Sequence, residues 1–280
     1  MYRLIPRRSG GLITGYREIS SSSNPYYKEY RRLAGSRKHR RSAGRLALEG
    51  PRLVREALAA GLYPEVIFAT RRFLKEGGEK IEPVLPGETR RYLLPPSLFA
   101  AMADTETPQE IAAIFPFREP APHTFSLKTL SLAIILDGLQ DPGNMGTIIR
   151  TAAAAGVEAV YYGPGSADPY SPKALRSSAG AIFHLPPSAL EDPPAQVRLL
   201  QRNGFTVAAA LPRADHSFWE IDYRQKVAIL IGSESSGLSQ ELIAAADCSI
   251  FIPQYSPLDS LNAAIATAVI VYEARRQRSK

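Results

Sequence analysis

From residue 131 onwards, short apolar runs alternate with segments whose residues suit helices. Strands of a parallel sheet are buried on both faces and therefore have continuous apolar sequences, while the helices between them cover the sheet. The alternation predicts an α/β fold with a parallel sheet. The predicted strands are residues 132–136, 157–162, 182–185, 206–211, 227–231 and 249–252, and the predicted helices are residues 144–155, 173–178, 191–202 and 240–246.

Residues 252–273 combine a polar loop with an unusually apolar helix. Pro253 ends the preceding apolar run, because proline fixes its backbone and has no N–H to donate. From Leu261 the residues are small and apolar, which predicts a helix that is apolar around most of its circumference and is buried in the fold or against another chain. Ser260 is the predicted N-cap. An ordinary packing helix is the alternative to a functional element.

Length and composition fit a globular protein of one large or two modest domains. The chain has 280 residues, of which 45% are hydrophobic and 22% are charged. It has no apolar run of about 18 residues, so we expect no membrane-spanning segment. The basic residues at its start are not followed by the apolar core of a secretory signal. Cys248 is the only cysteine, which excludes an internal disulfide and favours the reducing cytoplasm.

Positive charge is concentrated near the N-terminus. Residues 1–50 contain twelve Lys or Arg and three Glu, a net charge of +9, whereas the whole chain carries +7. Cations neutralise phosphates, and the interleaved rings of Tyr26, Tyr27 and Tyr30 suit stacking on bases. This segment predicts a nucleic-acid partner. A solvated, partly disordered tail is the alternative.

The chain is expected to contain two domains. Residues 25–45 are predicted to be helical and basic, and residues 46–49, 51–60 and 66–69 are a predicted strand, helix and strand. A proline-rich segment then resembles a linker. The predicted organisation is a basic extension over residues 1–24, a small α/β RNA-binding domain over 25–118, a linker over 119–128 and the parallel-sheet domain over 129–280.

Three loops follow predicted strands at the edge of the sheet where ligands bind in such folds. Their sequences are DGLQDPGNMGTIIR after residue 136, GSESSGLSQEL after residue 231 and PQYSPLDSLN after residue 252. Gly, Ser and Pro at these positions expose backbone groups that can bind a polar ligand. No P-loop, dinucleotide-binding or hydrolase-elbow motif is present, and the four His are isolated. We therefore expect no metal site and no catalytic triad.

Together the three loops resemble the three motifs of the SpoU (TrmH) family of RNA 2′-O-ribose methyltransferases, within the SPOUT superfamily. The matching residues are Asn144, Gly146 and Arg150 in the first motif, Gly232, Glu234, Gly237 and Leu238 in the second, and Ile252, Pro253, Ser260, Leu261 and Asn262 in the third. The departures are Ser235 and Ser256 for usual glycines, Gln254 for a usual methionine and Ala264 for a usual serine. The N-terminal part also resembles the substrate-binding domain that often precedes this catalytic domain.

This resemblance implies a fold, a cofactor and a set of site residues. The fold is a deep trefoil knot at the carboxyl end that binds S-adenosylmethionine, and the domain forms a homodimer. Arg150 is implied to engage the ribose hydroxyl, either as the base or by binding the adjacent phosphate. Around it the implied catalytic residues are Asn144, Glu234, Ser260 and Asn262, and the implied cofactor-binding residues are Gly232, Ile252 and Leu261, which act mainly through backbone groups.

Several of these residues also have ordinary structural interpretations. Asn144 and Ser260 could be helix N-caps, Ile252 and Leu261 could be core residues, and Glu234 could be a solvated loop carboxylate. The favoured function is methylation of a ribose 2′-hydroxyl in RNA, with ribosomal RNA as the expected substrate. The alternatives are methylation of transfer RNA, an RNA-binding protein that has lost its cofactor, and a small-molecule methyltransferase.

Overall fold

The computed structural model describes residues 15–76, 78, 81–103, 105, 107–122, 125–255 and 261–279. Its internal contacts divide the chain into two compact units. The first comprises residues up to Arg118 together with Tyr170–Arg176, and the second comprises Glu119–Pro169 and Ser177–Lys280. The predicted limits of the extension and the linker stay predictions.

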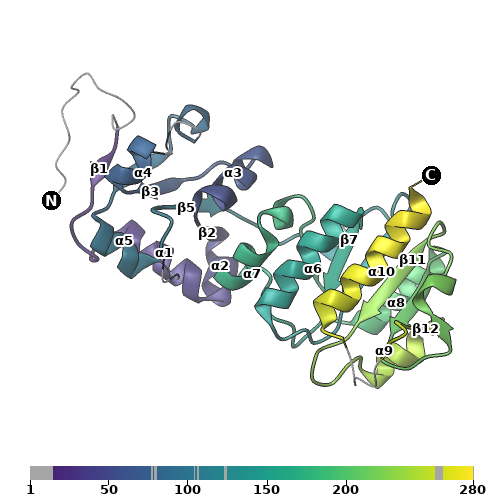
Figure 1. The fold of residues 1–280 in the computed structure, drawn as a ribbon. Coiled ribbons are helices and arrows are strands. Elements are labelled where there is room, and N and C mark those ends of the chain that lie inside the picture. Colours follow the sequence, from purple (N-terminus) through teal and green to yellow (C-terminus); the bar gives the residue numbers. More distant parts are fainter. Residues whose placement is uncertain are drawn as a thin grey trace. The chain divides into compact units, whose positions relative to one another are not determined.

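The second unit contains a seven-stranded sheet in which every neighbouring pair of strands is parallel (Figure 1). The strand order is β10-β12-β9-β11-β6-β7-β8. The parallel α/β fold predicted from the apolar runs is confirmed. Its strands are β6 (Leu132–Leu136), β7 (Ala159–Tyr162), β8 (Ser188–Ala189), β9 (Thr206–Ala210), β10 (His216–Ser217), β11 (Val227–Ile231) and β12 (Cys248–Phe251).

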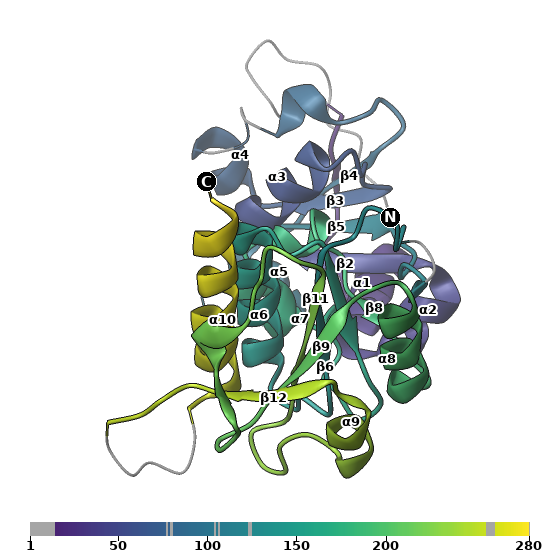
Figure 2. The same cartoon turned by 90° about the vertical axis from the view of Figure 1, so that its right-hand side faces the viewer.

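Helices cover both faces of this sheet (Figure 2). Two of them, α6 (Pro142–Ala155) and α10 (Ala263–Arg278), pack against each other. On the opposite face, α8 (Pro193–Arg202) and α9 (Gln240–Ala245) bury Val197 and Leu242 against alternate residues of the central strands. Helix α7 (Pro172–Ser178) falls mostly within Tyr170–Arg176, which belongs to the first unit. Within the described part of the chain, no helix is long and apolar enough to cross a membrane.

The strand predicted over residues 182–185 is wrong. A short 3-10 helix, Ala181–Phe183, lies there instead, and the strand that extends the sheet is β8, further along the chain. The backbone N–H groups of His184 and Leu185 both donate to the carbonyl oxygen of Ala181, at 3.0 and 2.9 Å, so they are already used within the local turn. A short apolar run cannot by its periodicity be told from a buried helical turn.

The first unit contains a five-stranded mixed sheet in the order β1-β4-β3-β5-β2. Strand β5 runs antiparallel to β2 and β3, whereas β4 is parallel to β3 and β1. Its strands are β1 (Arg17–Glu18), β2 (Arg45–Glu49), β3 (Val66–Ala69), β4 (Arg90–Leu93) and β5 (Ile111–Pro116), and its helices are α1 (Pro25–Gly35), α2 (Arg37–Ala43), α3 (Pro51–Ala59), α4 (Arg71–Glu76) and α5 (Pro96–Met102).

The helical segment predicted over residues 25–45 consists of two helices. Ser36 interrupts it with an extended backbone, at φ −136° and ψ 111°, and its side-chain oxygen accepts a hydrogen bond from the N–H of His39 at 3.2 Å. Ser36 therefore ends α1 and caps the start of α2, in agreement with the preference of serine for N-cap positions.

The predicted stacking of RNA bases on Tyr27 and Tyr30 is wrong. These side chains are only 2% and 3% exposed and belong to the core of the first unit. Their three-residue spacing places both on the inward face of α1. Tyr26 is half-buried against Tyr92, with the guanidinium group of Arg90 5.4 Å from its ring centre.

The basic residues of this segment also divide into two groups. Arg40 is buried and donates hydrogen bonds to the carbonyl oxygens of Leu33 and Ala34 at the end of α1. Arg45 forms an ion pair with Glu65 at 2.9 Å. Lys28, Arg31 and Arg32, in contrast, are exposed and share one face of α1, because they follow i, i+3, i+4 spacing. Part of the positive charge is structural, and part is available on the surface.

Candidate active site

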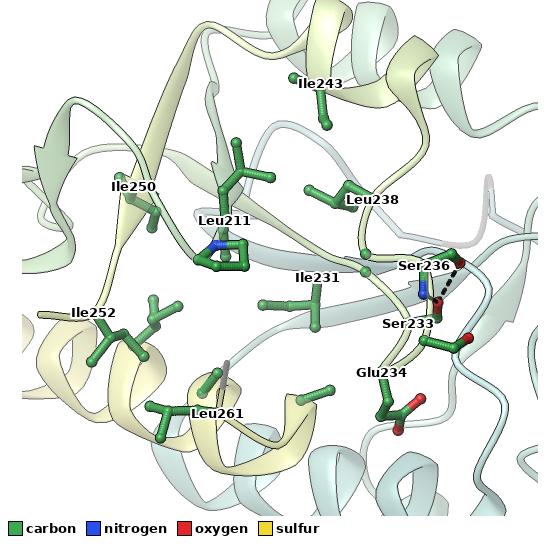
Figure 3. Close-up of a pocket in the computed structure, with 18 of the residues that line it drawn as sticks. Leu211, Ile231, Ser233, Glu234, Ser236, Leu238, Ile243, Ile250, Ile252 and Leu261 are labelled. Atoms are coloured by element: carbon green, nitrogen blue, oxygen red, sulfur yellow. Dashed lines mark hydrogen bonds between the residues drawn. The ribbon is translucent and has the colours of Figure 1, made fainter. Parts of the chain in front are cut away.

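The three motif loops follow strands β6, β11 and β12 at one edge of the parallel sheet. Around the loops after β11 and β12 lies a pocket of about 410 Å³, which also reaches the start of α10 (Figure 3). Ile250, Ile252 and Leu211 lie on one side of this pocket, and the polar loop with Ser233 and Glu234 lies on the other. The pocket therefore has an apolar side and a polar side.

The three predicted cofactor-binding residues, Gly232, Ile252 and Leu261, all line this pocket. Ile252 and Leu261 are partly exposed, unlike the fully buried core residues of the strands. At Gly232 a Cβ atom would lie 2.1 Å from the carbonyl carbon of Gly237 and 2.2 Å from the nitrogen of Leu238. This close approach of two backbone segments requires glycine. Cofactor binding by the three residues stays a prediction.

The loop after β11 is held closed by its own hydrogen bonds. Backbone groups of Ser233 and Gly237 exchange two bonds of 3.1 Å, and the hydroxyl oxygens of Ser233 and Ser236 lie 2.7 Å apart. Gly237 has a φ of +66°, but Ser235, which replaces a usual glycine, is not among the described non-glycine residues with positive φ. The replacement at Ser235 therefore causes no backbone strain. Ser256 lies outside the described residues.

Side chains from all three motifs are linked by hydrogen bonds near the polar side of the pocket. The side-chain amide of Asn262 donates to the Oδ1 atom of Asn144 at 3.3 Å, and the amide of Asn144 donates to the carboxylate of Glu234. These two bonds join residues that are 118 and 90 positions apart in the sequence. We call Asn262, Asn144 and Glu234 the amide relay.

The direction of the amide relay is set by the N-terminus of α10. The Oδ1 atom of Asn262 accepts hydrogen bonds from the N–H groups of Ala264 and Ile265, at 2.9 and 3.2 Å. Its Nδ2 atom is therefore the one that faces Asn144 and donates. A carboxylate can only accept, so Glu234 ends the sequence. The partial positive charge at the N-termini of α6 and α10 also favours a carboxylate here.

The helix caps differ from the predicted ones. Asp141 caps α6, and its side-chain oxygen accepts from the N–H of Gly143 at 3.1 Å. Asn144 is therefore not an N-cap, and its amide is available for the relay. Asn262, not Ser260, caps α10. Ser260 itself lies outside the described residues.

Arg150 lies apart from the amide relay. It is exposed on α6, six residues beyond Asn144, which corresponds to about 9 Å along a helix axis. No hydrogen bond or ion pair joins it to Asn144, Glu234 or Asn262 among the described residues. The structure thus brings three of the predicted catalytic residues together and leaves Arg150 facing solvent.

Asp137 also connects the loops, although the motifs gave no reason to single it out. It follows β6 directly, and its backbone N–H donates to the carbonyl oxygen of Ile231 at 2.8 Å. Its carboxylate accepts a hydrogen bond from the N–H of Ser239 at 2.8 Å. Asp137 therefore holds the loop after β6 against the loop after β11. The only sequence signal for this role of Asp137 is that an acidic residue directly follows a predicted strand.

Thiolate and metal chemistry have no support at this site. Burial, and to a lesser extent the Asp247 carboxylate, raises the pKa of the Cys248 thiol, which therefore stays protonated at neutral pH. Cys248 also begins β12, at the end remote from the motif loops. In the described ranges, no three His, Cys, Asp or Glu side chains are grouped as metal ligands.

Comparison with known proteins identifies the family. The model of the SpoU rRNA Methylase family matches residues 131–272. This chain belongs to the SpoU family. An MRM3-like substrate binding domain matches residues 24–113. The SpoU match includes all three motif loops and the three residues of the amide relay.

Similar proteins support the same assignment. An uncharacterized tRNA/rRNA methyltransferase of Synechocystis is 36% identical, with 95% of this chain and 96% of that protein covered. The 23S rRNA (guanosine(2553)-2′-O)-methyltransferase RlmP of Bacillus subtilis is 34% identical, with coverages of 92% and 99%. The crystal structure of an AdoMet-bound rRNA methyltransferase from Sinorhizobium meliloti is 30% identical, with coverages of 92% and 97% and a TM-score of 0.80.

These findings confirm the predicted SpoU family, the α/β fold with an N-terminal substrate-binding domain, the enzyme class and S-adenosylmethionine as cofactor. The trefoil knot stays a prediction, as do the roles of the individual site residues.

We expect Gly232→Ala to weaken binding of S-adenosylhomocysteine by about five- to 150-fold, because the added methyl group separates two backbone segments of the pocket wall and such overpacking costs about 1–3 kcal/mol. Isothermal titration calorimetry would measure the dissociation constant. Gly35→Ala is the matched control, since a Cβ at Gly35 meets no atom within 4 Å. Unchanged affinity in Gly232→Ala would contradict the close approach.

Proposed function

We propose that this protein transfers a methyl group from S-adenosylmethionine to a ribose 2′-hydroxyl of ribosomal RNA. The proposal rests on one observation above all, the joining of the three motif loops by the amide relay beside the pocket. Family membership and the similarity to rRNA 2′-O-methyltransferases support the reaction and the class of RNA. The nucleotide that is modified is not part of the proposal.

The pocket suits S-adenosylmethionine in size and chemistry. Its volume of about 410 Å³ is within the usual range of roughly 300–1,000 Å³ for small-molecule sites. The apolar side formed by Leu211, Ile250 and Ile252 suits a flat purine ring, and the loop after β11 places Glu234 and Ser235 on the polar side. The RNA-binding-only alternative is therefore disfavoured.

Methyl transfer requires correct alignment and removal of the hydroxyl proton. S-adenosylmethionine, when bound, supplies a methyl group on a positively charged sulfonium. We propose that the amide relay fixes the rim of the pocket where the ribose is presented. Arg150 binds the neighbouring phosphate and stabilises the developing alkoxide, since a guanidinium offers several N–H donors to anionic oxygens, and the hydroxyl proton is released to solvent water. This assignment favours anion binding over the alternative role as base.

Arg150→Ala should lower methyl transfer by about 10²–10³-fold, as the loss of one group that stabilises transition-state charge does in other enzymes. Binding of S-adenosylhomocysteine should not change, because Arg150 does not line the pocket. The assay is transfer of labelled methyl to unmodified ribosomal and transfer RNA, followed by digestion to nucleosides. Label found only in transfer RNA would favour the alternative substrate.

Two further variants sharpen this experiment. Arg150→Lys retains the charge and should recover part of the activity. Arg198→Ala removes another exposed arginine of the same unit, from α8, and should be as active as the unchanged protein. Equal activity of Arg150→Ala and Arg198→Ala would remove Arg150 from the mechanism.

The exposed cations of α1 are the proposed RNA-binding face of the first unit. Lys28, Arg31 and Arg32 lie side by side on that helix, and the unit matches a substrate-binding domain. Because Tyr27 and Tyr30 are buried, RNA bases cannot stack on their rings. The proposed means of binding at this face is therefore contact between the cations and RNA phosphates.

Replacing Lys28, Arg31 and Arg32 together by Gln should weaken RNA binding and reduce the slope of log K against log salt by about 0.7–0.9 for each phosphate that is no longer neutralised. Fluorescence anisotropy at several salt concentrations would measure both quantities. The matched control replaces Arg71, Arg72 and Lys75 on α4, which removes the same charge from the same unit. If the two triple replacements weaken RNA binding equally, the net charge of the unit, and not the position of the cations on α1, accounts for the binding.

We also propose a homodimer through the exposed face of α10, and a cytoplasmic location, where ribosomal RNA is made and assembled in bacteria. Ile265 and Tyr272 are 54% and 52% exposed on α10, and their seven-residue spacing places them on one face with half-buried Val269 between them. An apolar stripe of this kind on a helix suits burial against a second copy of the chain.

Ile265→Asp combined with Tyr272→Asp should convert the dimer to a monomer, because two charges would be buried without partners in the interface. Size-exclusion chromatography with light scattering would measure the mass. Tyr63→Asp, at a tyrosine that is 53% exposed in the first unit, is the matched control. A dimer that persists in the double variant would place the interface elsewhere.

A further inference from the structure

Gln254 lines the pocket, and its side chain carries a buried polar atom. Its Oε1 atom is inaccessible to solvent and has no hydrogen-bond partner among the described residues. A buried carbonyl oxygen without a donor costs about 1–3 kcal/mol, so such atoms need a specific explanation. The position is also one of the departures from the family motif, in which methionine is usual.

The backbone aims this side chain into the pocket. Ile250, Ile252 and Gln254 all line it, whereas Phe251, Pro253 and Tyr255 do not. This alternation is that of an extended chain, in which every second side chain points to the same side. Tyr255 is correspondingly fully exposed. Gln254 therefore continues the row of pocket-lining side chains that begins at the end of β12.

The row belongs to the apolar side of the pocket. The N–H of Leu211 donates to the carbonyl oxygen of Ile250 at 2.9 Å, which fixes the end of β9 beside β12. Ile250, Ile252 and Leu211 lie opposite Ser233 and Glu234 in Figure 3. The charged methionyl part of the cofactor would be poorly solvated against the apolar side, whereas a purine suits it. The group that meets Gln254 is therefore the purine.

We propose that the Gln254 carboxamide is a cofactor-binding group that accepts a hydrogen bond from the exocyclic amine of the adenine. This amine is the donor of the adenine ring, and a glutamine side chain has the geometry to meet the amino edge of adenine. In the orientation that buries Oε1, Gln254 distinguishes adenine from a purine that carries an acceptor at the same position. The inference rests on the proposed function, since it assumes that the pocket holds this cofactor.

The test compares two ligands by calorimetry. One is S-adenosylhomocysteine, and the other is S-inosylhomocysteine, in which oxygen replaces the adenine amine. The unchanged protein should prefer S-adenosylhomocysteine by at least about tenfold, because this ligand leaves no polar group unpaired. Gln254→Met should bind S-adenosylhomocysteine about three- to tenfold more weakly and lose the preference by the same factor, which a double-mutant cycle isolates.

Two variants separate recognition from folding. Gln254→Glu retains an acceptor and should retain the preference for the amine. Gln140→Met, at an exposed glutamine that does not line the pocket, should bind both ligands as the unchanged protein does. Thermal melts of all variants establish that they fold.

Three outcomes overturn the proposal. Gln254→Met with unchanged affinity would show that the carboxamide does not reach the ligand. An equal loss for both ligands would assign Gln254 a structural role only. If the unchanged protein binds neither ligand, the proposed function fails first, and the assignment of Gln254 fails with it.

Discussion

The site depends on the hydrogen bonds that Asn262 makes at the start of α10. Its carbonyl oxygen accepts from two backbone N–H groups of the first turn, so its amide nitrogen can only face outward as a donor. That orientation determines how Asn144 and then Glu234 are arranged. Asn144 must turn its oxygen towards Asn262 to accept, so its amide nitrogen donates to Glu234. A helix cap, which normally stabilises only its own helix, here also fixes side chains from two distant loops.

The pocket beside this cap is shaped mainly by backbone. Gly232 allows the loop after β11 to cross closely over the segment at Gly237, and the extended chain after β12 supplies Ile252 and Gln254 in alternation. Such a wall tolerates changes of side chain as long as the backbone path is preserved. This is why Ser235 can replace a usual glycine without strain, whereas Gly232 cannot be replaced.

The sequence predicted the sheet well because a parallel strand buried on both faces has a local signature. Strands β6 and β11 begin and end where their apolar runs do. The strand predicted over residues 182–185 was wrong because a buried helical turn has the same apolar signature. The contact between Asn144 and Asn262 spans 118 residues, so no local pattern could reveal it, and only resemblance to a family placed these residues together. The burial of Tyr27 depends on what packs against α1, which charge counting ignores.

Helix α1 separates two properties of the first unit. Its inward face carries Tyr27, Tyr30 and Leu33, which belong to the core, while its outward face carries Lys28, Arg31 and Arg32. Residues that are adjacent in the chain thus have different roles, one in the core and the other on the basic surface. Because the proposed phosphate contacts and the core lie on opposite faces of α1, substitutions at the outward positions can change how tightly RNA is held while the core stays intact, so RNA affinity can diverge among related enzymes on an unchanged scaffold.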